Sequence, residues 1–162
     1  MSEIVQVSKA ATRNAASEQL LTFMVDGQEY GVDILRVQEI RGWTAPMPIP
    51  NAPPYIKGVI NIRGDVVPIA DLRERLGLPS LQYGQTTVVV VLRVQHANRE
   101  RVMGVIVDAM SDVTNVPSDA VKAPPTFAEV SEAPLARGIA TFEEKMITIL
   151  DVDRIFGEPP VR

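Results

Sequence analysis

A repeated segment is the feature that most constrains how this chain can fold. Residues 57–77 (KGVINIRGDVVPIADLRERLG) align without a gap with residues 137–157 (RGIATFEEKMITILDVDRIFG). Few residues are identical, but the apolar positions match in phase, and phase decides which face of a strand is buried. A shorter similarity relates residues 31–40 to residues 104–113. We therefore predict two copies of one small β module with different loop lengths.

The first copy of this segment predicts a strand, a tight turn, a second strand and one capped helical turn. Two β-branched runs, 59–62 and 66–69, flank Gly64, which can adopt the positive φ that a short hairpin connection needs. The carboxylate of Asp71 is placed to cap a helical turn, and Glu74 follows at the spacing of a capping box.

The two copies differ most at the tip of this hairpin. The first copy has Arg63-Gly64-Asp65 at the tip, and the second has Glu143-Glu144-Lys145. A repeat that keeps the phase of its core positions and changes only its tip indicates that the tip has no packing role. The tip is therefore free to be specialised for binding.

Further strands are predicted outside the repeated segment. Residues 20–26 and 29–33 are predicted to form a hairpin around a Gly-Gln turn. In residues 34–40 the spacing of apolar residues becomes helical, which predicts a helical turn followed by an irregular strand. The most apolar strands, 86–93 and 102–108, are expected at the centre of the fold, joined by a polar loop.

Residues 46–54 (PMPIPNAPP) contain five of the 13 prolines. Because proline has no backbone N–H, this segment must be an edge strand or a polyproline-like connector.

Many short β-branched strands, few helices and a repeated module predict a mainly β fold of two small closed barrels side by side. The predicted modules are residues 19–80 and 81–157, with a flexible N-terminal tail at 1–18 and a C-terminal tail at 158–162. Exchange of strands between the two modules is left open, because the sequence does not decide which strands pair.

Composition excludes several classes of function. A formal net charge of −4 argues against a general nucleic-acid binder. The absence of cysteine excludes disulfides, a thiol nucleophile and a thiolate metal site. No apolar run has the length of a membrane span or a signal sequence, so we expect a cytoplasmic protein without direct membrane insertion.

We find no constellation of residues that would support catalysis. His96 is the only histidine and lies in a polar stretch, and neither a phosphate-binding loop nor a GxGxxG motif occurs. Four carboxylates near strand ends are better explained as caps and turn residues than as metal ligands: Asp108, Asp112, Asp151 and Asp153. The sequence therefore predicts a binding module with no metal and no cofactor, and the junction of the barrels is a favoured place for a binding groove.

Five segments of the chain together resemble one known family. They are EYGVDILRVQEIRG at 29–42, YIKGVINIRGDVVPIADLRERLG at 55–77, the strands TTVVVVLRV and RVMGVIVDAMSDV, and MITILDVDRIF. These segments resemble the CheW family, the coupling proteins of bacterial chemotaxis. The resemblance spans roughly residues 20–157. It implies two SH3-like five-stranded barrels and a non-catalytic adaptor in signal transduction.

The resemblance also implies partners and sites. The partners would be the cytoplasmic hairpin tips of methyl-accepting chemoreceptors and the regulatory domain of the histidine kinase CheA. The residues that correspond to the family's receptor-binding motif are Val37, Glu39 and Arg63. The residues implied for kinase binding are Met47, Ile49, Lys122 and Phe127. The protein would then associate with membrane receptor arrays only through its partners.

One departure and two alternative functions accompany this resemblance. Pro46, Pro48 and Pro50 make the edge around Met47 more proline-rich than the family pattern, which puts the backbone pairing of that edge in question.

The same adaptor chemistry could serve a non-chemotactic receptor–kinase pathway, such as surface motility. A small-molecule-binding barrel is the other alternative, although few polar groups within the strands are available to fix a ligand.

Overall fold

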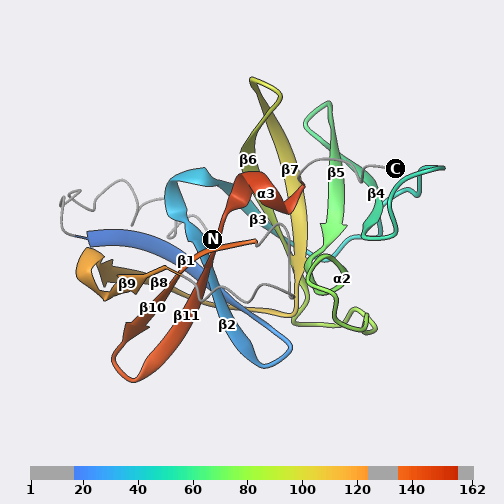
Figure 1. The fold of residues 1–162 in the computed structure, drawn as a ribbon. Helices are drawn as coiled ribbons and strands as arrows, with labels where there is room; N and C mark the ends of the chain where they lie inside the picture. The colour runs from blue at the N-terminus through green and yellow to red at the C-terminus, as the bar shows by residue number, and fades with distance from the viewer. Residues whose placement is uncertain (1–16, 124–134, 157–162) are drawn as a thin grey trace.

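The computed structural model describes residues 17–123 and 135–156, which form two curved sheets packed side by side (Figure 1). The strands are β1 (Ser17–Val25), β2 (Gln28–Asp33), β3 (Val37–Gly42), β4 (Ile56–Ile62), β5 (Asp65–Asp71), β6 (Val88–His96), β7 (Arg99–Val107), β8 (Ala109–Pro117), β9 (Val121–Lys122), β10 (Ala136–Phe142) and β11 (Lys145–Leu150). The helical turns are η1 (Ile34–Arg36), α2 (Leu72–Arg75), η2 (Ser118–Ala120) and α3 (Val152–Ile155). Within these two described ranges, every helix is too short to cross a membrane.

The two sheets have the same strand order. The strands β3, β6, β7, β5 and β4 of one sheet correspond in turn to β8, β1, β2, β11 and β10 of the other. One sheet runs β3-β6-β7-β5-β4, and the other runs β8-β1-β2-β11-β10-β9. The sixth strand, β9, has only two residues, and an isolated bridge between Met47 and Val59 takes its place in the five-stranded sheet. The predicted pair of SH3-like barrels is therefore confirmed, with one short additional strand in the second barrel.

Each sheet takes strands from both sides of residue 80. In the six-stranded sheet, β2 from the first half pairs in parallel with β11, and Gly31 lies opposite Ile149. In the five-stranded sheet, β7 from the second half pairs in parallel with β5, and Gly104 lies opposite Ile69. The shorter sequence similarity therefore marks the place where the chain crosses between the sheets, from β2 to β3 in the first half and from β7 to β8 in the second.

Both copies of the repeated segment fold as predicted, with one difference at the helical cap. The Asp71 carboxylate accepts a hydrogen bond of 2.9 Å from the Arg73 backbone N–H, and Asp151 accepts one of 3.1 Å from the Asp153 N–H. The capping-box expectation for Glu74 is wrong, because its carboxylate forms an ion pair of 2.5 Å with Lys57 instead.

Each of the four hairpins in the described part of the chain turns through two residues with positive φ. The turns are Asp26-Gly27, Arg63-Gly64, Ala97-Asn98 and Glu143-Glu144. This geometry matches the twist of the adjoining strands. The predicted polar loop after residue 94 is therefore almost entirely strand, because the ladder of β6 and β7 continues to the pair His96–Arg99.

The largest buried cluster draws its side chains from both sheets. Phe23 and Leu21 on β1 pack there with Val90 and Leu92 on β6. Val89 and Val91 point to the opposite face of β6, into the interior of the five-stranded barrel. β6 is thus buried on both faces, which explains its continuous run of valines. The junction of the barrels is a packed core in this region.

The predicted ends of the fold are only partly described. β1 begins at Ser17, two residues before the predicted boundary, because Ser17 and Glu18 pair with Pro117 and Val116 of β8. The remaining residues of the predicted N-terminal tail, and the predicted C-terminal tail at 158–162, lie outside the described residues.

Candidate functional site

A cluster of three charged residues lies where the two edges of the five-stranded sheet approach each other. Glu39 is on the edge strand β3, and Arg63 is at the tip of the hairpin that contains the other edge strand, β4. Glu39 Oε1 accepts a hydrogen bond of 2.5 Å from Arg63, and Oε2 accepts one of 2.9 Å from Arg41. We name these three residues the Glu39 cluster. It joins the open edges of the barrel by side chains rather than by backbone pairing.

The Glu39 cluster is fixed on one side and exposed on the other. The Glu39 side chain is 21% exposed, whereas the Arg63 side chain is 69% exposed. The guanidinium of Arg63 therefore has most of its surface available to a partner, while Glu39 and Arg41 hold its position.

Val37 does not join the Glu39 cluster, although it is only two residues away from Glu39. A bulge in β3 shifts the register, so that Val37 lies opposite Leu92 while Glu39 lies opposite Val91. Because Leu92 and Val91 face opposite sides of β6, the bulge sends Val37 toward the core between the sheets. Of the three residues implied for receptor binding, the structure thus brings together only Glu39 and Arg63.

The neighbouring arginines lower the pKa of Glu39. Hydrogen bonding to Arg63 lowers the pKa of Glu39 below its ordinary value of 4.5, burial opposes this shift, and Arg41 adds to it. A lowered pKa in the folded state means that the ionised carboxylate stabilises the fold. This contribution is complete above the ordinary glutamate pKa, and it is lost as the pH falls through the lower pKa of the folded protein.

We expect wild-type protein to be more stable than Glu39→Gln at neutral pH, and the difference to disappear in acid. The Glu39→Gln variant lacks the carboxylate, so comparison with wild type isolates the titration of this group from that of the other acids. Urea unfolding of both proteins at about pH 7, 5 and 3 measures the difference. A difference in stability that stays constant over this pH range would contradict the conclusion that the ionised Glu39 carboxylate stabilises the fold.

The proline-rich edge around Met47 keeps one pair of backbone hydrogen bonds. Met47 donates to the Val59 carbonyl and accepts from the Val59 N–H, both at 2.9 Å. This bridge forms because Met47 has a free N–H between two prolines. The Met47 side chain is 64% exposed and Ile49 is 40% exposed. The two residues together present an apolar edge next to β4.

Gly58 makes this edge possible. Its φ is +145°, and a Cβ atom at this position would lie 2.2 Å from the Met47 carbonyl oxygen. We expect Gly58→Ala to lower the free energy of unfolding by about 2 kcal/mol, because it disrupts the bridge and strains the backbone. Gly64→Ala is the matched control, since φ is +92° but nothing lies within 4 Å. It should cost about 1 kcal/mol in denaturant unfolding, and equal losses for both variants would contradict the steric explanation.

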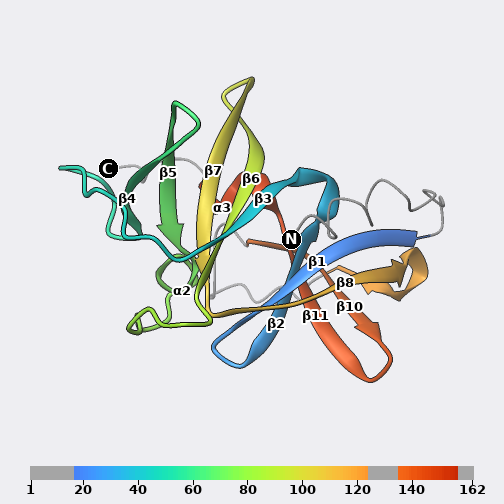
Figure 2. The same ribbon diagram turned by 180° about the vertical axis from the view of Figure 1, so that it is seen from behind.

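Lys122 occupies the position in the second barrel that Met47 occupies in the first. Lys122 pairs with Ile139, and Met47 pairs with Val59, one residue after the glycine of each repeat. The elements β9 and β4 lie at opposite sides of the molecule, so Lys122 is far from the Met47 edge (Figures 1 and 2). Phe127 lies outside the described residues.

A polar network around Arg73 was not foreseen from the sequence. The Arg73 side chain is 8% exposed and donates to Asp108 at 3.0 Å, to Asp26 at 3.1 Å and to the Pro79 carbonyl at 2.8 Å. Asp26 lies in the turn of the six-stranded sheet, and Arg73 lies on α2 beside the five-stranded sheet. The network therefore joins the two barrels. Of the residues in this network, the sequence analysis singled out only Asp108, as a carboxylate near the end of a strand.

An aromatic pair covers one end of the five-stranded barrel. The rings of Trp43 and Tyr83 have centroids 4.1 Å apart, and both pack on the interior cluster of that barrel. The Tyr83 hydroxyl donates to Asp71 at 2.7 Å. Burial, and then the neighbouring Asp71, raise the pKa of Tyr83 above its ordinary value, so this hydroxyl stays protonated at physiological pH.

The recesses near these groups offer little to a small ligand. One has a volume of about 170 Å³ and is lined by residues of the Arg73 network, whose polar groups already bond to each other. Another, of about 540 Å³, is an open space between β5 and β7 lined by residues 65–68 and 99–103. Within residues 17–123 and 135–156 there is also no cluster of acidic or histidine side chains that could hold a metal ion.

Filled barrels, an exposed charged cluster and an exposed apolar edge define a scaffold that binds other proteins through its surface. The chain belongs to the family of CheW-like domains, whose model matches residues 19–159. Proteins of this family are scaffolds or adaptors in chemotaxis and are not enzymes.

Individual relatives support this assignment over nearly the whole chain. The chemotaxis protein CheW of Klebsiella aerogenes is 37% identical over 157 residues, which cover 97% of this chain and 92% of that protein. The chemotaxis protein CheW of Rhizobium meliloti is 40% identical over 138 residues, covering 85% and 86%. The crystal structure of the scaffolding protein TtCheW from Thermoanaerobacter tengcongensis matches with a TM-score of 0.76 at 27% identity, covering 86% of this chain and 92% of that one.

Proposed function

We propose that this protein couples the cytoplasmic tips of chemoreceptors to the histidine kinase CheA. The observation that carries the proposal is the Glu39 cluster, which presents an exposed guanidinium on a fixed base at the edge of a barrel. A receptor tip is an antiparallel helical hairpin, and a helix that meets this edge could be oriented by the charges of Arg63 and Glu39.

The proposed kinase-binding surfaces are the apolar edge around Met47 and Ile49 and the segment that begins at Lys122. The exposure of Met47 and Ile49 supports the first surface, since exposed apolar side chains that lie together are typical of protein contacts. Because Met47 and Lys122 lie on different barrels, the two surfaces could engage two different kinase molecules. Two weak contacts on one scaffold raise the effective concentration of each partner and favour an extended assembly. In a cell, the protein would be cytoplasmic and associate with receptor arrays through these contacts.

Arg63→Ala is expected to weaken receptor binding by about tenfold, because it removes the exposed charge that orients the partner. Stability should change by no more than about 0.5 kcal/mol, since the side chain is 69% exposed. Co-sedimentation of purified protein with a receptor cytoplasmic fragment measures the binding. Arg154→Ala is a control of matched charge, because its side chain is 56% exposed and lies on α3.

The function itself is tested by sedimentation of the protein with a receptor cytoplasmic fragment and CheA together. We expect a ternary complex that does not form when this protein is left out. If Arg63→Ala binds the receptor fragment as well as wild type does, the proposed receptor-binding site is wrong. If wild-type protein forms no ternary complex, the proposed coupling function is wrong.

A further inference from the structure

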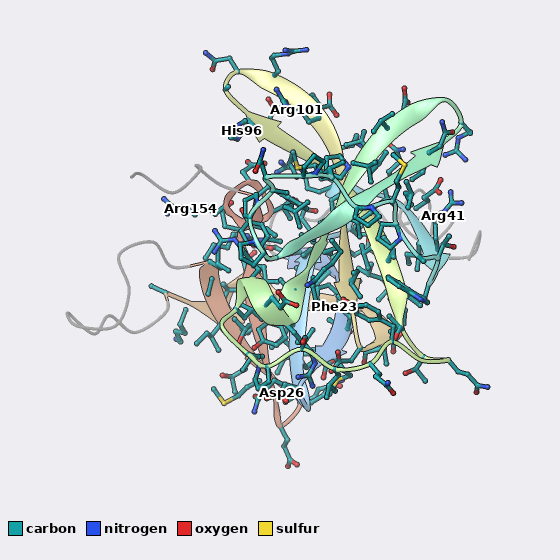
Figure 3. The ribbon with its side chains drawn as sticks, turned by 90° about the vertical axis from the view of Figure 1, so that its right-hand side faces the viewer. Phe23, Asp26, Arg41, His96, Arg101 and Arg154 are labelled. Carbon is teal, nitrogen blue, oxygen red and sulfur yellow. The ribbon has the colours of Figure 1, made fainter. Side chains whose placement is uncertain are left out.

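Methionine thioethers are the only sulfur groups in this chain. The sequence has six methionines and no cysteine, so a mild oxidant meets no thiol that would react before them. Figure 3, in which sulfur is yellow, shows the methionine sulfurs spread over both barrels rather than gathered in one cluster. Their surroundings therefore differ, and exposure decides which of them an oxidant can reach.

Two of the methionines in the described part of the chain are exposed, and the other three are not. Met47 is 64% exposed and Met146 is 65% exposed, whereas Met103 is 8% exposed and packs in the largest buried cluster. Met24 and Met110 are half-buried. A mild oxidant should therefore oxidise Met47 and Met146 first.

Met47 is held in place by its backbone and not by its side chain. Its N–H and its carbonyl both bond to Val59 at 2.9 Å, and Pro46 and Pro48 restrict the chain on either side. Because the side chain takes no part in these bonds, a chemical change at its sulfur leaves the bridge to β4 intact. Oxidation of Met47 therefore changes the surface of this edge and not the fold.

The surface that would change is the apolar edge proposed to bind the kinase. Met47 and Ile49, which is 40% exposed, form this edge together. Oxidation converts the apolar thioether into a polar sulfoxide. Burial of a sulfoxide oxygen in an apolar contact, without a hydrogen-bond donor, is unfavourable. The oxidised edge should therefore bind an apolar partner surface more weakly.

We propose that Met47 is a reversible oxidation site that controls docking of the kinase on this edge. The inference rests on the kinase contact proposed above. With hydrogen peroxide as the oxidant, a lone pair of the sulfur attacks one peroxide oxygen, so that an S–O bond forms and the O–O bond breaks. The sulfur is oxidised to the sulfoxide, and the peroxide is reduced as its second oxygen leaves as water. Methionine sulfoxide reductases restore the thioether, with a thiol reductant that is oxidised to a disulfide while the sulfoxide oxygen leaves as water.

Mild treatment of the full chain with hydrogen peroxide tests the site. Peptide mapping by mass spectrometry should show one added oxygen on Met47 and on Met146 before Met103 is oxidised. The treated protein should keep its urea unfolding midpoint but bind CheA about tenfold more weakly than untreated protein. Incubation with methionine sulfoxide reductases and a thiol should restore the binding of CheA.

Three variants assign the effect to Met47. Met47→Leu keeps an apolar side chain of similar volume without an oxidisable sulfur, so its binding of CheA should resist peroxide. Met146→Leu is the matched control, because it removes an equally exposed methionine and leaves Met47 in place, and its binding should weaken as that of wild type does. Met47→Gln carries a polar group without any oxidant, and it should bind CheA as weakly as the oxidised wild type.

The outcomes separate this inference from the proposed function. Undiminished CheA binding by the oxidised wild type, a loss that persists in Met47→Leu, or oxidation of Met103 before Met47 would overturn the redox control and leave the kinase contact standing. If untreated wild type and Met47→Leu both fail to bind CheA, the proposed kinase contact is wrong, and the redox control of it is wrong as well.

Discussion

Residues 1–80 and 81–162, expressed as two separate chains, are expected to be unfolded alone and to form the native fold when mixed. Each barrel needs strands from both fragments. In the first fragment, the β1–β2 hairpin lacks its neighbours β8 and β11, and in the second the β6–β7 hairpin lacks β3 and β5. The cut falls in the exposed connector after Pro79, so it removes no strand.

The core explains why neither fragment should be stable. The largest buried cluster joins Phe23 and Leu72 of the first fragment to Leu92, Val105 and Leu150 of the second. Because the hydrophobic stabilisation of the fold follows the apolar area buried, a fragment that leaves half of this cluster exposed cannot offset the entropy of ordering its chain. Packing between the fragments is therefore required for folding.

Circular dichroism and tryptophan fluorescence of each fragment and of the mixture measure this outcome. Trp43 is the only tryptophan, and it stacks on Tyr83 of the other fragment, so its emission reports reassembly. A cooperative thermal transition in either fragment alone would show that one module folds independently, and would refute the dependence of each barrel on both halves.

Replacing Arg73 with methionine is expected to lower the free energy of unfolding by about 3 kcal/mol. Methionine fills most of the volume, but it leaves the carboxylates of Asp108 and Asp26 and the Pro79 carbonyl without their shared donor. The two barrels also lose a polar link at their junction. The loss is large because the Arg73 side chain is 8% exposed and its guanidinium makes all three contacts at once.

Urea unfolding compares this variant with Arg154→Met. Arg154 is 56% exposed and lies 3.4 Å from Asp151, so its replacement should change stability by less than about 0.5 kcal/mol. Arg73→Lys keeps the charge but supplies a single donor group, and it should fall between wild type and Arg73→Met. Equal stability of all the variants would mean that the Arg73 network contributes nothing to the junction.

Several parts of the fold follow from local sequence alone. Gly64 between two β-branched runs specifies a tight hairpin, and Asp71 specifies the cap of a helical turn, because both effects act over a few neighbouring residues. The phase of apolar residues in the repeat likewise predicts the equivalent strands at 56–62 and 136–142. The adaptor class came from the family resemblance, and the family match confirms it.

Other features depend on residues that are far apart in the chain. Local patterning placed Glu74 in a capping box, but Lys57 on the adjacent strand competes for its carboxylate. Val37 and Glu39 look like neighbours on one strand, but the bulge opposite β6 separates them. The Arg73 network could not be predicted, since its acids lie 35 and 47 residues away.

The sequence by itself determined that this chain forms two copies of a β module with matching hairpins, since phase and turn chemistry are local properties. Only the tertiary structure decided which hairpin enters which barrel. A strand can pair equally well with any partner whose pattern matches, and the two copies match each other. The choice is made by the apolar core shared between the sheets and by contacts such as that of Arg73, which form only when the whole chain is assembled.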